Sequence, residues 1–280
     1  MTKSEDKYFW RTSVTYIEPN KILVRGYPIE ELMEHLTFGE AVYLILRGEL
    51  PPTEGHGKMM NAILTSIIDY GIGAPSVCAA RYVASSLLPH RGEWPPYAFC
   101  SAVAAGMSAI GIYHGGAPGG SAEWLQDGVK RMREQRKSAE QVAEELAREI
   151  KERGERIQGF GHPHHKVDPR YVKLLELAER YEVAGDHCRL VQAMEKVLEK
   201  VVGRKLPGNA GSALAAILSD LGFDWKMCYG IFAIARCPGL VAHVYEEMTK
   251  NAPFRVPPLE TVCYDGPTER RLPMTNEERK

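Results

Sequence analysis

Residues 94–122 read WPPYAFCSAVAAGMSAIGIYHGGAPGGSA and carry no Asp, Glu, Lys or Arg. The apolar part of this stretch runs from Ala98 to Tyr113. It is shorter than the roughly 20 residues that a helix needs to cross a bilayer, and Gly106, Ser108 and Gly111 dilute it. The stretch therefore predicts a buried helix of a soluble protein, followed by a glycine-rich loop.

The composition around this stretch is that of an ordinary globular protein. The chain has 280 residues, 44% hydrophobic and 25% charged, which is enough for one large domain or two smaller ones. Lys and Arg number 35 and Asp and Glu 36, and no run of five like charges occurs, so a nucleic-acid partner is not expected. The six cysteines form no CxxC pair, and the polar start MTKSEDKYFWRTS lacks the apolar core of a signal peptide. We expect a cytoplasmic protein without a disulfide framework.

Strand signals are confined to the start of the chain, and the rest of the periodicity is helical. Residues 14–17 and 22–24, separated by Pro19-Asn20, predict one short hairpin. A helix is predicted to end at Gly48, and another to follow the capping box Ser138-Ala-Glu-Gln141. Further helical periodicity covers residues 171–181, 187–202, 213–221, 225–235 and 240–248. With no βαβ alternation and no fixed repeat, the sequence predicts an all-α fold.

The segment from Asn251 onward is rich in proline and charge and has no periodicity. We expect a tail there that is either disordered or laid over a partner subunit.

The glycine-rich loop YHGGAPGG at residues 113–120 is the first candidate functional segment. Its four glycines permit unusual backbone angles and the close approach of a ligand to the main chain, and the following helix N-terminus favours an anion. His114 lies inside this loop and is a candidate functional residue. The alternative is a glycine-rich connection with an incidental histidine.

A second loop, QGFGHPHHKVDPR at residues 158–170, holds three histidines within four positions. Their HxHH spacing differs from the i, i+4 spacing of helical zinc sites, and no Cys or Glu lies nearby, so a metal site is the less favoured reading. The loop favours His162 as a hydrogen-bond donor and Arg170 as a planar clamp for a carboxylate. A surface turn at Asp168-Pro169 with solvated charges is the structural alternative.

Two further segments add candidate residues. LPGNAGS at residues 206–212 lies before a predicted helix and contains Asn209. FAIAR at residues 232–236 puts Arg236 among strongly apolar neighbours. A buried arginine needs an anionic partner, which is either a carboxylate of the core or that of a substrate.

Together these segments resemble the citrate synthase superfamily, and most closely its short citryl-CoA lyases. The matching stretches are RGYPIEEL at 25–32, FGEAVYLILRGELP at 38–51, HGGA at 114–117, GFGH with DPR at 159–170, and FAIAR followed by GLVAH at 232–243. They cover nearly all of the chain. The resemblance implies a two-domain helical dimer. Residues 1–116 and 224–280 would form the large domain, with a C-terminal arm at 251–280 reaching the other subunit, and residues 117–223 a small domain that closes over the site.

The resemblance also implies an activity and roles for individual residues. The family makes or breaks a carbon–carbon bond between the α carbon of an acyl-CoA thioester and the carbonyl carbon of a keto acid. His114 matches the histidine that donates to the thioester oxygen, and His162 the one that hydrogen-bonds the keto or alkoxide oxygen. Arg170 and Arg236 match arginines that bind carboxylates of the acid.

Coenzyme A is the implied cofactor, as part of the substrate. Gly159, Gly161, His165 and Lys166 are the candidates for contacting it, while Asn209 joins the predicted substrate-binding residues. No metal is expected. The predicted partners are an acyl-CoA, a di- or tricarboxylate and a second copy of the chain, with neither nucleic acid nor membrane.

Two family positions differ in this chain. The family's catalytic aspartate lies in a Pro-x-Asn-Val-Asp segment, and Gly211 occupies its position here. Deleting a positioned general acid or base costs ~10²–10⁴-fold in rate, so we expect modified proton chemistry. Tyr70 replaces a histidine that helps to hold the keto acid, and its hydroxyl preserves a donor for substrate binding. Ser212, Asp69 and Asp220 are the neighbouring polar groups in the sequence that we considered as replacements.

Three functions follow from this pattern. The first is cleavage of a 3-hydroxy-3-carboxyacyl-CoA, such as citryl-CoA, to acetyl-CoA and a 2-keto acid such as oxaloacetate, or the reverse synthesis. The second, motivated by Gly211, is hydrolysis of a CoA thioester or another altered reaction on one. The third is a non-catalytic protein that binds a CoA ester or a carboxylate.

Overall fold

The computed structural model describes residues 10–87, 96–154, 156–162, 164–203 and 205–272. Its β structure is a small antiparallel sheet of three strands, β1 (Thr15–Glu18), β2 (Lys21–Val24) and β3 (Tyr27–Pro28). Glu18 pairs with Lys21 across the predicted turn, so the hairpin is confirmed. Strand β3 has no counterpart among the predicted strands. Arg25 and Gly26, with φ of 51° and 89°, form the left-handed two-residue turn that leads into it.

The described part of the chain otherwise consists of eleven α-helices and one 3-10 turn, which confirms the all-α class. The helices are α1 (Ile29–His35), α2 (Phe38–Arg47), α3 (Glu54–Ser66), α4 (Pro75–Ser86), α5 (Pro96–Ser108), α6 (Ala117–Gln135), α7 (Ala139–Glu152), α8 (Pro169–Arg180), α9 (Asp186–Val202), α10 (Ala210–Asp220) and α11 (Met227–Lys250). The predicted capping box at Ser138 starts α7, and Gly48 ends α2 with φ of 82°.

Helix α11 differs from the prediction because it is continuous. The sequence suggested two helices, ending at residue 235 and starting at 240, but α11 runs through Pro238. Pro238 lacks only the N–H that would bond the carbonyl of Ile234, and packing holds the helix together on both sides of it. Gly239 allows close approach there, because a Cβ at this position would lie 2.4 Å from the carbonyl oxygen of Ile68.

Helix α5 also corrects an expectation. The charge-free stretch was predicted to form a buried helix, yet only Ala98, Ala102 and Gly106 of α5 are buried. One face of α5 packs on α4 and α11 and the other faces outward, with Tyr97 70% exposed. Helix α11 is the one described helix long and apolar enough to cross a membrane by length and composition, and it packs against α3, α4, α5 and α6.

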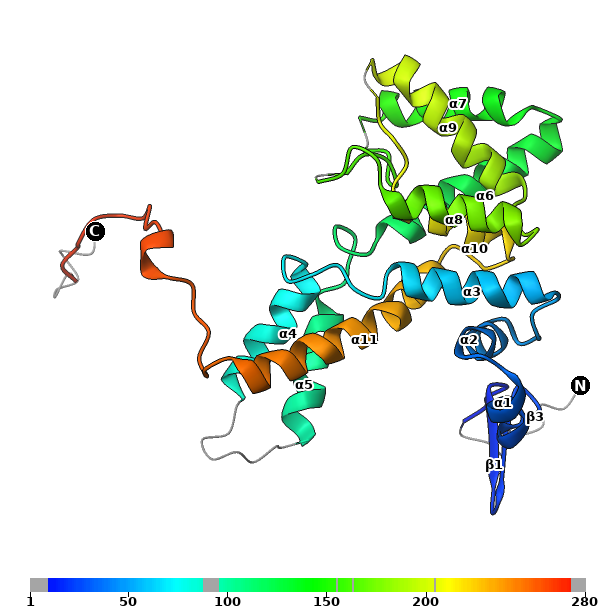
Figure 1. Ribbon diagram of the computed structural model, residues 1–280. Coiled ribbons are helices and arrows are strands. Elements are labelled where there is room, and N and C mark those ends of the chain that lie inside the picture. Colours follow the sequence, from blue (N-terminus) through cyan, green and yellow to red (C-terminus); the bar gives the residue numbers. More distant parts are fainter. Residues whose placement is uncertain (1–9, 88–95, 155, 163, 204, 273–280) are drawn as a thin grey trace, which may run out of the picture.

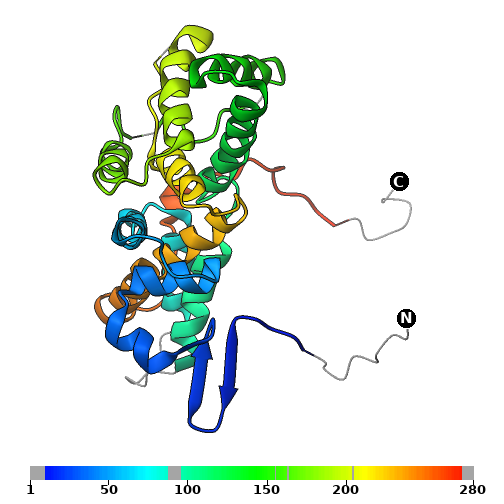
Figure 2. The ribbon, with the colours of Figure 1, turned by 90° about the vertical axis from the view of Figure 1, so that its right-hand side faces the viewer.

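The buried side chains form two clusters. The larger joins α2, α3, α6 to α10 and the first half of α11, and the smaller joins α4, α5 and the second half of α11. Figures 1 and 2 show α6 to α10 stacked at one end of the molecule and the sheet at the other, with α2 and α3 between them, and α11 runs beside α4 and α5. The domain boundaries at residues 117 and 223 stay a prediction.

The described C-terminal segment leaves the body of the protein after α11 (Figure 1). Its first residues contact α4 and α11. The Arg255 guanidinium pairs with Glu247, and the backbone N–H of Arg255 donates to Ser85 Oγ at 2.7 Å. Beyond this point the described residues are exposed, including Leu259 and Tyr264.

Candidate active site

The end of α3 and the starts of α6 and α10 meet around a cavity of 190 Å³, which α11 closes from one side. All six residues predicted to be catalytic or to bind the substrate line it, although they come from five separate segments of the chain: Tyr70, His114, His162, Arg170, Asn209 and Arg236. The remaining lining residues are Ile67, Gly115, Ala117, Pro118, Ala210, Gly211, Leu214 and Phe232. The sequence motifs therefore converge on one site.

His114 is held at the wall of the cavity by a tight turn. Its N–H and carbonyl bond to Gly111, and Gly115 follows with φ of 84°. Its Nε2 lies 2.8 Å from the hydroxyl of Ser76, at the start of α4. Burial, and then the positive charge of Arg236, lower the pKa of His114, so the imidazole is neutral at pH 7. The hydrogen bond with Ser76 occupies Nε2, and Nδ1, which has no hydrogen-bond partner among the described residues, is the ring nitrogen that remains for a ligand.

The tautomer of His162 follows from its neighbours. Its Nδ1 accepts the backbone N–H groups of His164 and His165, at 3.1 and 3.0 Å. Since Nδ1 is an acceptor, the neutral ring carries its proton on Nε2, which lies 2.9 Å from Tyr70 Oη and donates to it. Burial, then the charges of neighbours such as His165 and Arg170, lower the pKa of His162 and keep it neutral. His162 and Tyr70 therefore act as a linked pair.

Arg170 is fixed by a carboxylate of its own segment. Its Nε and Nη2 lie 3.0 and 2.9 Å from the two oxygens of Asp168, which also accepts the N–H of Ala210 at 2.9 Å. Burial alone would raise the pKa of Asp168, but these bonds outweigh it and lower the pKa. The alternative of a solvated surface turn is wrong, because Asp168 is 1% exposed. The Arg170 guanidinium lies over the Tyr70 ring, 4.9 Å from its centroid.

Arg236 is a buried cation with unused donors. It is 2% exposed, and its Nε donates to the carbonyl of Ile67 at 3.0 Å. Its Nη1 is buried without a hydrogen-bond partner, and no described carboxylate forms an ion pair with it. Burial lowers its pKa, and the nearby charge of Asp69 opposes this effect only in part. A buried guanidinium that lines a cavity and forms no ion pair with a described carboxylate fits an anionic ligand.

Asn209 and Gly211 form the opposite wall. The side-chain oxygen of Asn209 accepts the N–H of Gly211 at 2.9 Å and caps α10, while its amide donates to the carbonyl of Gly161 at 2.8 Å. A Cβ on Gly211 would lie 2.7 Å from the Cβ of Ala117, the first residue of α6. The position of the family's aspartate is thus closed by a neighbouring helix as well as lacking a side chain.

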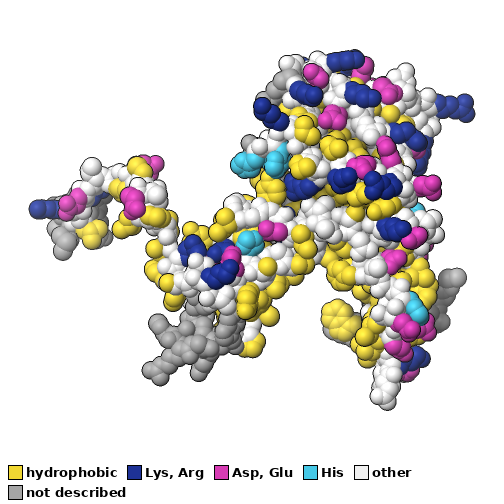
Figure 3. All heavy atoms as spheres, in the orientation of Figure 1, with side chains coloured by type: hydrophobic (Ala, Val, Ile, Leu, Met, Phe, Trp, Pro, Cys, Tyr) yellow, Lys and Arg dark blue, Asp and Glu magenta, His cyan; other side chains and the backbone are white. Residues whose placement is uncertain are grey.

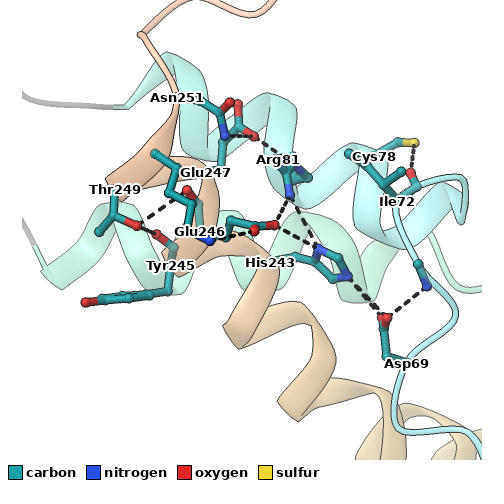
Figure 4. A network of polar contacts seen from close by, with 12 residues as sticks. Asp69, Ile72, Cys78, Arg81, His243, Tyr245, Glu246, Glu247, Thr249 and Asn251 are labelled. Carbon is teal, nitrogen blue, oxygen red and sulfur yellow. Dashed lines mark hydrogen bonds and ion pairs between the residues drawn. The ribbon is translucent and has the colours of Figure 1, made fainter.

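The other polar groups considered as replacements for this aspartate have different roles. Asp69 accepts the N–H of Gly71 at 2.8 Å and contacts His243 at 3.2 Å (Figure 4). Asp220 accepts N–H groups at the start of α9, and the Ser212 hydroxyl donates to the carbonyl of Asn209. None of the three lines the cavity, and no described Asp or Glu does.

The residues predicted to contact coenzyme A lie beside the cavity and do not line it. Gly159 and Gly161 have φ of 87° and 75°, and their segment pairs with the one at residues 207–209. The His165 ring lies 4.4 Å from that of His162, and Lys166 is exposed. Coenzyme A contact stays a prediction for these four residues. No group of three His, Cys, Asp or Glu among the described residues is arranged to hold a metal ion.

Two residues that shape the site were missed in the sequence. Ser76 lies at the start of α4, a helix that was not predicted, so nothing marked it as the partner of His114. Asp168 was visible in the DPR motif, but its burial depends on α10 packing over it.

Comparison with known proteins agrees with this site. A family model described as "Citrate synthase, C-terminal domain" matches residues 5–57 and 52–257. The chain is 30% identical over 218 residues to a citrate synthase of Synechocystis, covering 76% of this chain and 50% of that protein. It is 33% identical over 197 residues to a citrate/2-methylcitrate synthase of Bacillus subtilis, covering 69% and 47%. The chain spans about half the length of these relatives.

Among solved structures, citryl-CoA lyase from Hydrogenobacter thermophilus superposes with a TM-score of 0.84 at 39% identity, covering 98% of this chain and 100% of that one. ATP citrate lyase of Methanosaeta concilii, solved with (3S)-citryl-CoA, gives a TM-score of 0.75 at 19% identity, with 94% and 43% covered, which shows the shared fold. The family match, the similar architecture and the converging motifs lead to one conclusion: the chain belongs to the citrate synthase family.

Proposed function

We propose that this protein cleaves a 3-hydroxy-3-carboxyacyl-CoA, such as citryl-CoA, to acetyl-CoA and a 2-keto acid such as oxaloacetate. The buried guanidinium of Arg236 carries the proposal, because it lines a cavity that also holds two neutral histidines and its Nη1 has no hydrogen-bond partner in the protein. A carboxylate of the substrate supplies the missing counter-ion. The likeness to citryl-CoA lyase over the whole chain supports the choice of substrate.

The proposed roles follow from where charge develops. Arg236 and the outer face of Arg170 bind carboxylates, which orients the bond to be broken. His114 donates from Nδ1 to the thioester oxygen and stabilises the enolate that leaves. The linked pair of His162 and Tyr70 hydrogen-bonds the oxygen that becomes the keto group through Tyr70 Oη, because His162 Nε2 already donates to that atom. Polar groups that are oriented before the substrate arrives stabilise such charges without reorganising.

The coenzyme A portion is proposed to lie along the segment of Gly159 and Gly161, with His165 and Lys166 near its phosphates. Residues 117–223 would form the small domain that closes over it. Lys and Arg side chains are mixed with Asp and Glu side chains over α7, α8 and α9 in this part of the molecule (Figure 3), so individual cations rather than a basic surface would contact the phosphates.

We also propose a homodimer with exchanged C-terminal arms. The chain exposes 18237 Å², whereas a compact monomer of its mass exposes about 12,000 Å². Exposed apolar residues gather on α5, on the turn before His114 and along the C-terminal segment: Tyr97, Ile112, Tyr113, Phe254, Leu259 and Tyr264. A second copy would cover these surfaces. Sedimentation at several concentrations tests this, and a monomer at micromolar concentration would contradict it.

Hydrolysis of a CoA thioester is the second candidate. The closure of the Gly211 position by Ala117 favours it, because hydrolysis needs no base at the α carbon. The two functions give different products. Incubation of the purified protein with citryl-CoA, followed by mass spectrometry, should yield acetyl-CoA and oxaloacetate. Citrate and free coenzyme A would instead indicate hydrolysis, and binding without any product would indicate a non-catalytic protein.

A further inference from the structure

We propose that Tyr70 transfers the proton in the carbon–carbon bond step, a task for which the position of Gly211 offers no side chain. This inference rests on the proposed function and adds a catalytic residue to it. It starts from the hydrogen bond of 2.9 Å between Tyr70 Oη and His162 Nε2, and from the position of Tyr70 on the wall of the cavity.

The phenol oxygen of Tyr70 has the unused hydrogen-bond donor and acceptor positions that a proton-transfer group needs. It offers two acceptor positions and one donor. His162 fills one acceptor position, because its Nδ1 is occupied by two backbone N–H groups and its proton is on Nε2. One acceptor position and the O–H remain for a ligand in the cavity. A group that receives one proton and delivers another requires both a free acceptor position and a free donor.

The other polar groups on the cavity wall cannot exchange a proton in this way. His162 has no free lone pair, and His114 has Nε2 bonded to Ser76 and its other ring nitrogen, Nδ1, assigned to the thioester oxygen in the proposed function. The two arginines, Arg170 and Arg236, stay protonated and only donate. The Asn209 amide is used by Gly211 and Gly161. Tyr70 is the remaining described group on the wall that both accepts and donates.

The proposed step balances without an additional reactant. The C3 hydroxyl of the substrate gives its proton to the phenol oxygen as the bond between C3 and the α carbon breaks. The electron pair of that bond stays on the α carbon, which takes the phenol's original proton. C3 becomes a keto carbon, acetyl-CoA leaves, and Tyr70 ends as a neutral phenol. His114 polarises the thioester during this step, and in synthesis the same transfers run backwards.

Neighbouring contacts fix the ring for this role. The Arg170 guanidinium lies 4.9 Å from the ring centroid and is itself held by Asp168. The backbone is fixed by Asp69, whose carboxylate accepts the N–H of Gly71 and contacts His243 (Figure 4). The phenol therefore stays oriented although the residue is 38% exposed.

The test compares Tyr70→Phe with Tyr16→Phe, which removes a phenol hydroxyl from the hairpin far from the cavity. For Tyr70→Phe we expect kcat for citryl-CoA cleavage to fall by ~10²–10⁴-fold, as for loss of a general acid or base. Oxaloacetate affinity, measured by calorimetry, should fall by less than about tenfold, since one neutral hydrogen bond is lost. Tyr16→Phe should keep both values. Circular dichroism and gel filtration check that the variants fold.

Tyr70→His provides a second variant, because an imidazole restores a donor but not an accepting and donating group on one atom. In Tyr70→His, the affinity for oxaloacetate should return toward that of the wild type, while kcat for citryl-CoA cleavage should stay as low as in Tyr70→Phe. Full cleavage by Tyr70→Phe, a change in KM alone, or wild-type kcat for Tyr70→His would each overturn the role of Tyr70 while leaving the proposed function intact. If the wild-type protein itself makes no acetyl-CoA, the proposed function fails, and this role for Tyr70 fails with it.

Discussion

The first residue of α6, Ala117, occupies the space beside Gly211, so that a Cβ on Gly211 would lie 2.7 Å from that of Ala117. Real Cβ atoms do not approach this closely, and both residues belong to well-packed helix starts. The two positions have therefore to be considered together. The packing around Gly211 therefore leaves no room for a larger side chain at this position.

Gly211→Asp should not create an efficient citrate synthase, because the new side chain forces α6 and α10 apart. We expect a loss of about 1–3 kcal/mol in the free energy of unfolding, as for other overpacked sites, measured by urea denaturation. Ala117→Gly combined with Gly211→Asp should recover part of the loss. Gly230→Ala on α11 is the control, since its Cβ meets nothing within 4 Å and should be neutral or stabilising. An unstrained, fully active Gly211→Asp enzyme would contradict this view of the packing.

Arg236→Met separates ligand binding from stability. Affinity for oxaloacetate or citrate should fall by roughly 10–150-fold, the equivalent of a charge-assisted hydrogen bond. The ligand-free protein should become more stable to heat, because a buried cation without a counter-ion is replaced by an apolar side chain. Arg133→Met removes an ion pair with Asp186 on the surface, and it should change neither the ligand affinity nor the thermal stability. Unchanged affinity in Arg236→Met would show that the carboxylate binds elsewhere.

The pH dependence of activity follows from the neutral histidines. Burial lowers the pKa of both His114 and His162 below the ordinary 6.5. We expect kcat/KM to stay level from pH 8 down to 6.5 and to fall only at lower pH, as the imidazoles gain protons. The unfolded chain binds these protons more readily, so stability should decline over the same acid range. An acid limb above pH 6.5 in the rate profile would exclude these histidines as the titrating groups.

Asp220→Asn tests a cap far from the cavity. The carboxylate lies 2.8 Å from His187 Nδ1 and accepts the backbone N–H groups of Gly185, His187 and Cys188. Burial alone would raise its pKa, but the bond with the His187 ring and then those with Cys188 and Gly185 outweigh burial and lower it. The substitution should cost about 1–3 kcal/mol at pH 7. Because the folded pKa lies below the unfolded value near 3.9, this contribution is complete above about pH 5 and is lost as the pH falls further.

Urea unfolding at pH 7 and pH 3 measures the difference in the free energy of unfolding between the wild type and Asp220→Asn. This difference should be smaller at pH 3. Asp127→Asn, at an exposed ion pair with Arg131, is the control and should cost less than about 1 kcal/mol. A difference that does not depend on pH would mean that shape rather than charge matters at residue 220.

Local signals in the sequence account for much of this protein. Apolar periodicity, the capping box at Ser138 and the stop at Gly48 depend only on neighbouring residues, and they predicted α2, α7, α8 and α9 with bounds close to those observed. The candidate segments also contained five residues that line the cavity, His114, His162, Arg170, Asn209 and Arg236, whereas Tyr70 was predicted only through the family resemblance. This was possible because a histidine in a glycine-rich loop or an arginine in an apolar helix is unusual without a functional reason.

Tertiary structure alone decided the remaining features, because they depend on contacts between distant segments. Helix α11 passes through Pro238 because packing on both sides compensates for one lost hydrogen bond. The proton of His162 is on Nε2 because two backbone N–H groups occupy Nδ1, and this directs it to Tyr70, 92 residues away in the chain. The resemblance predicts that Gly211 stands at the position of the family's aspartate, and only the fold shows that a side chain there would meet Ala117.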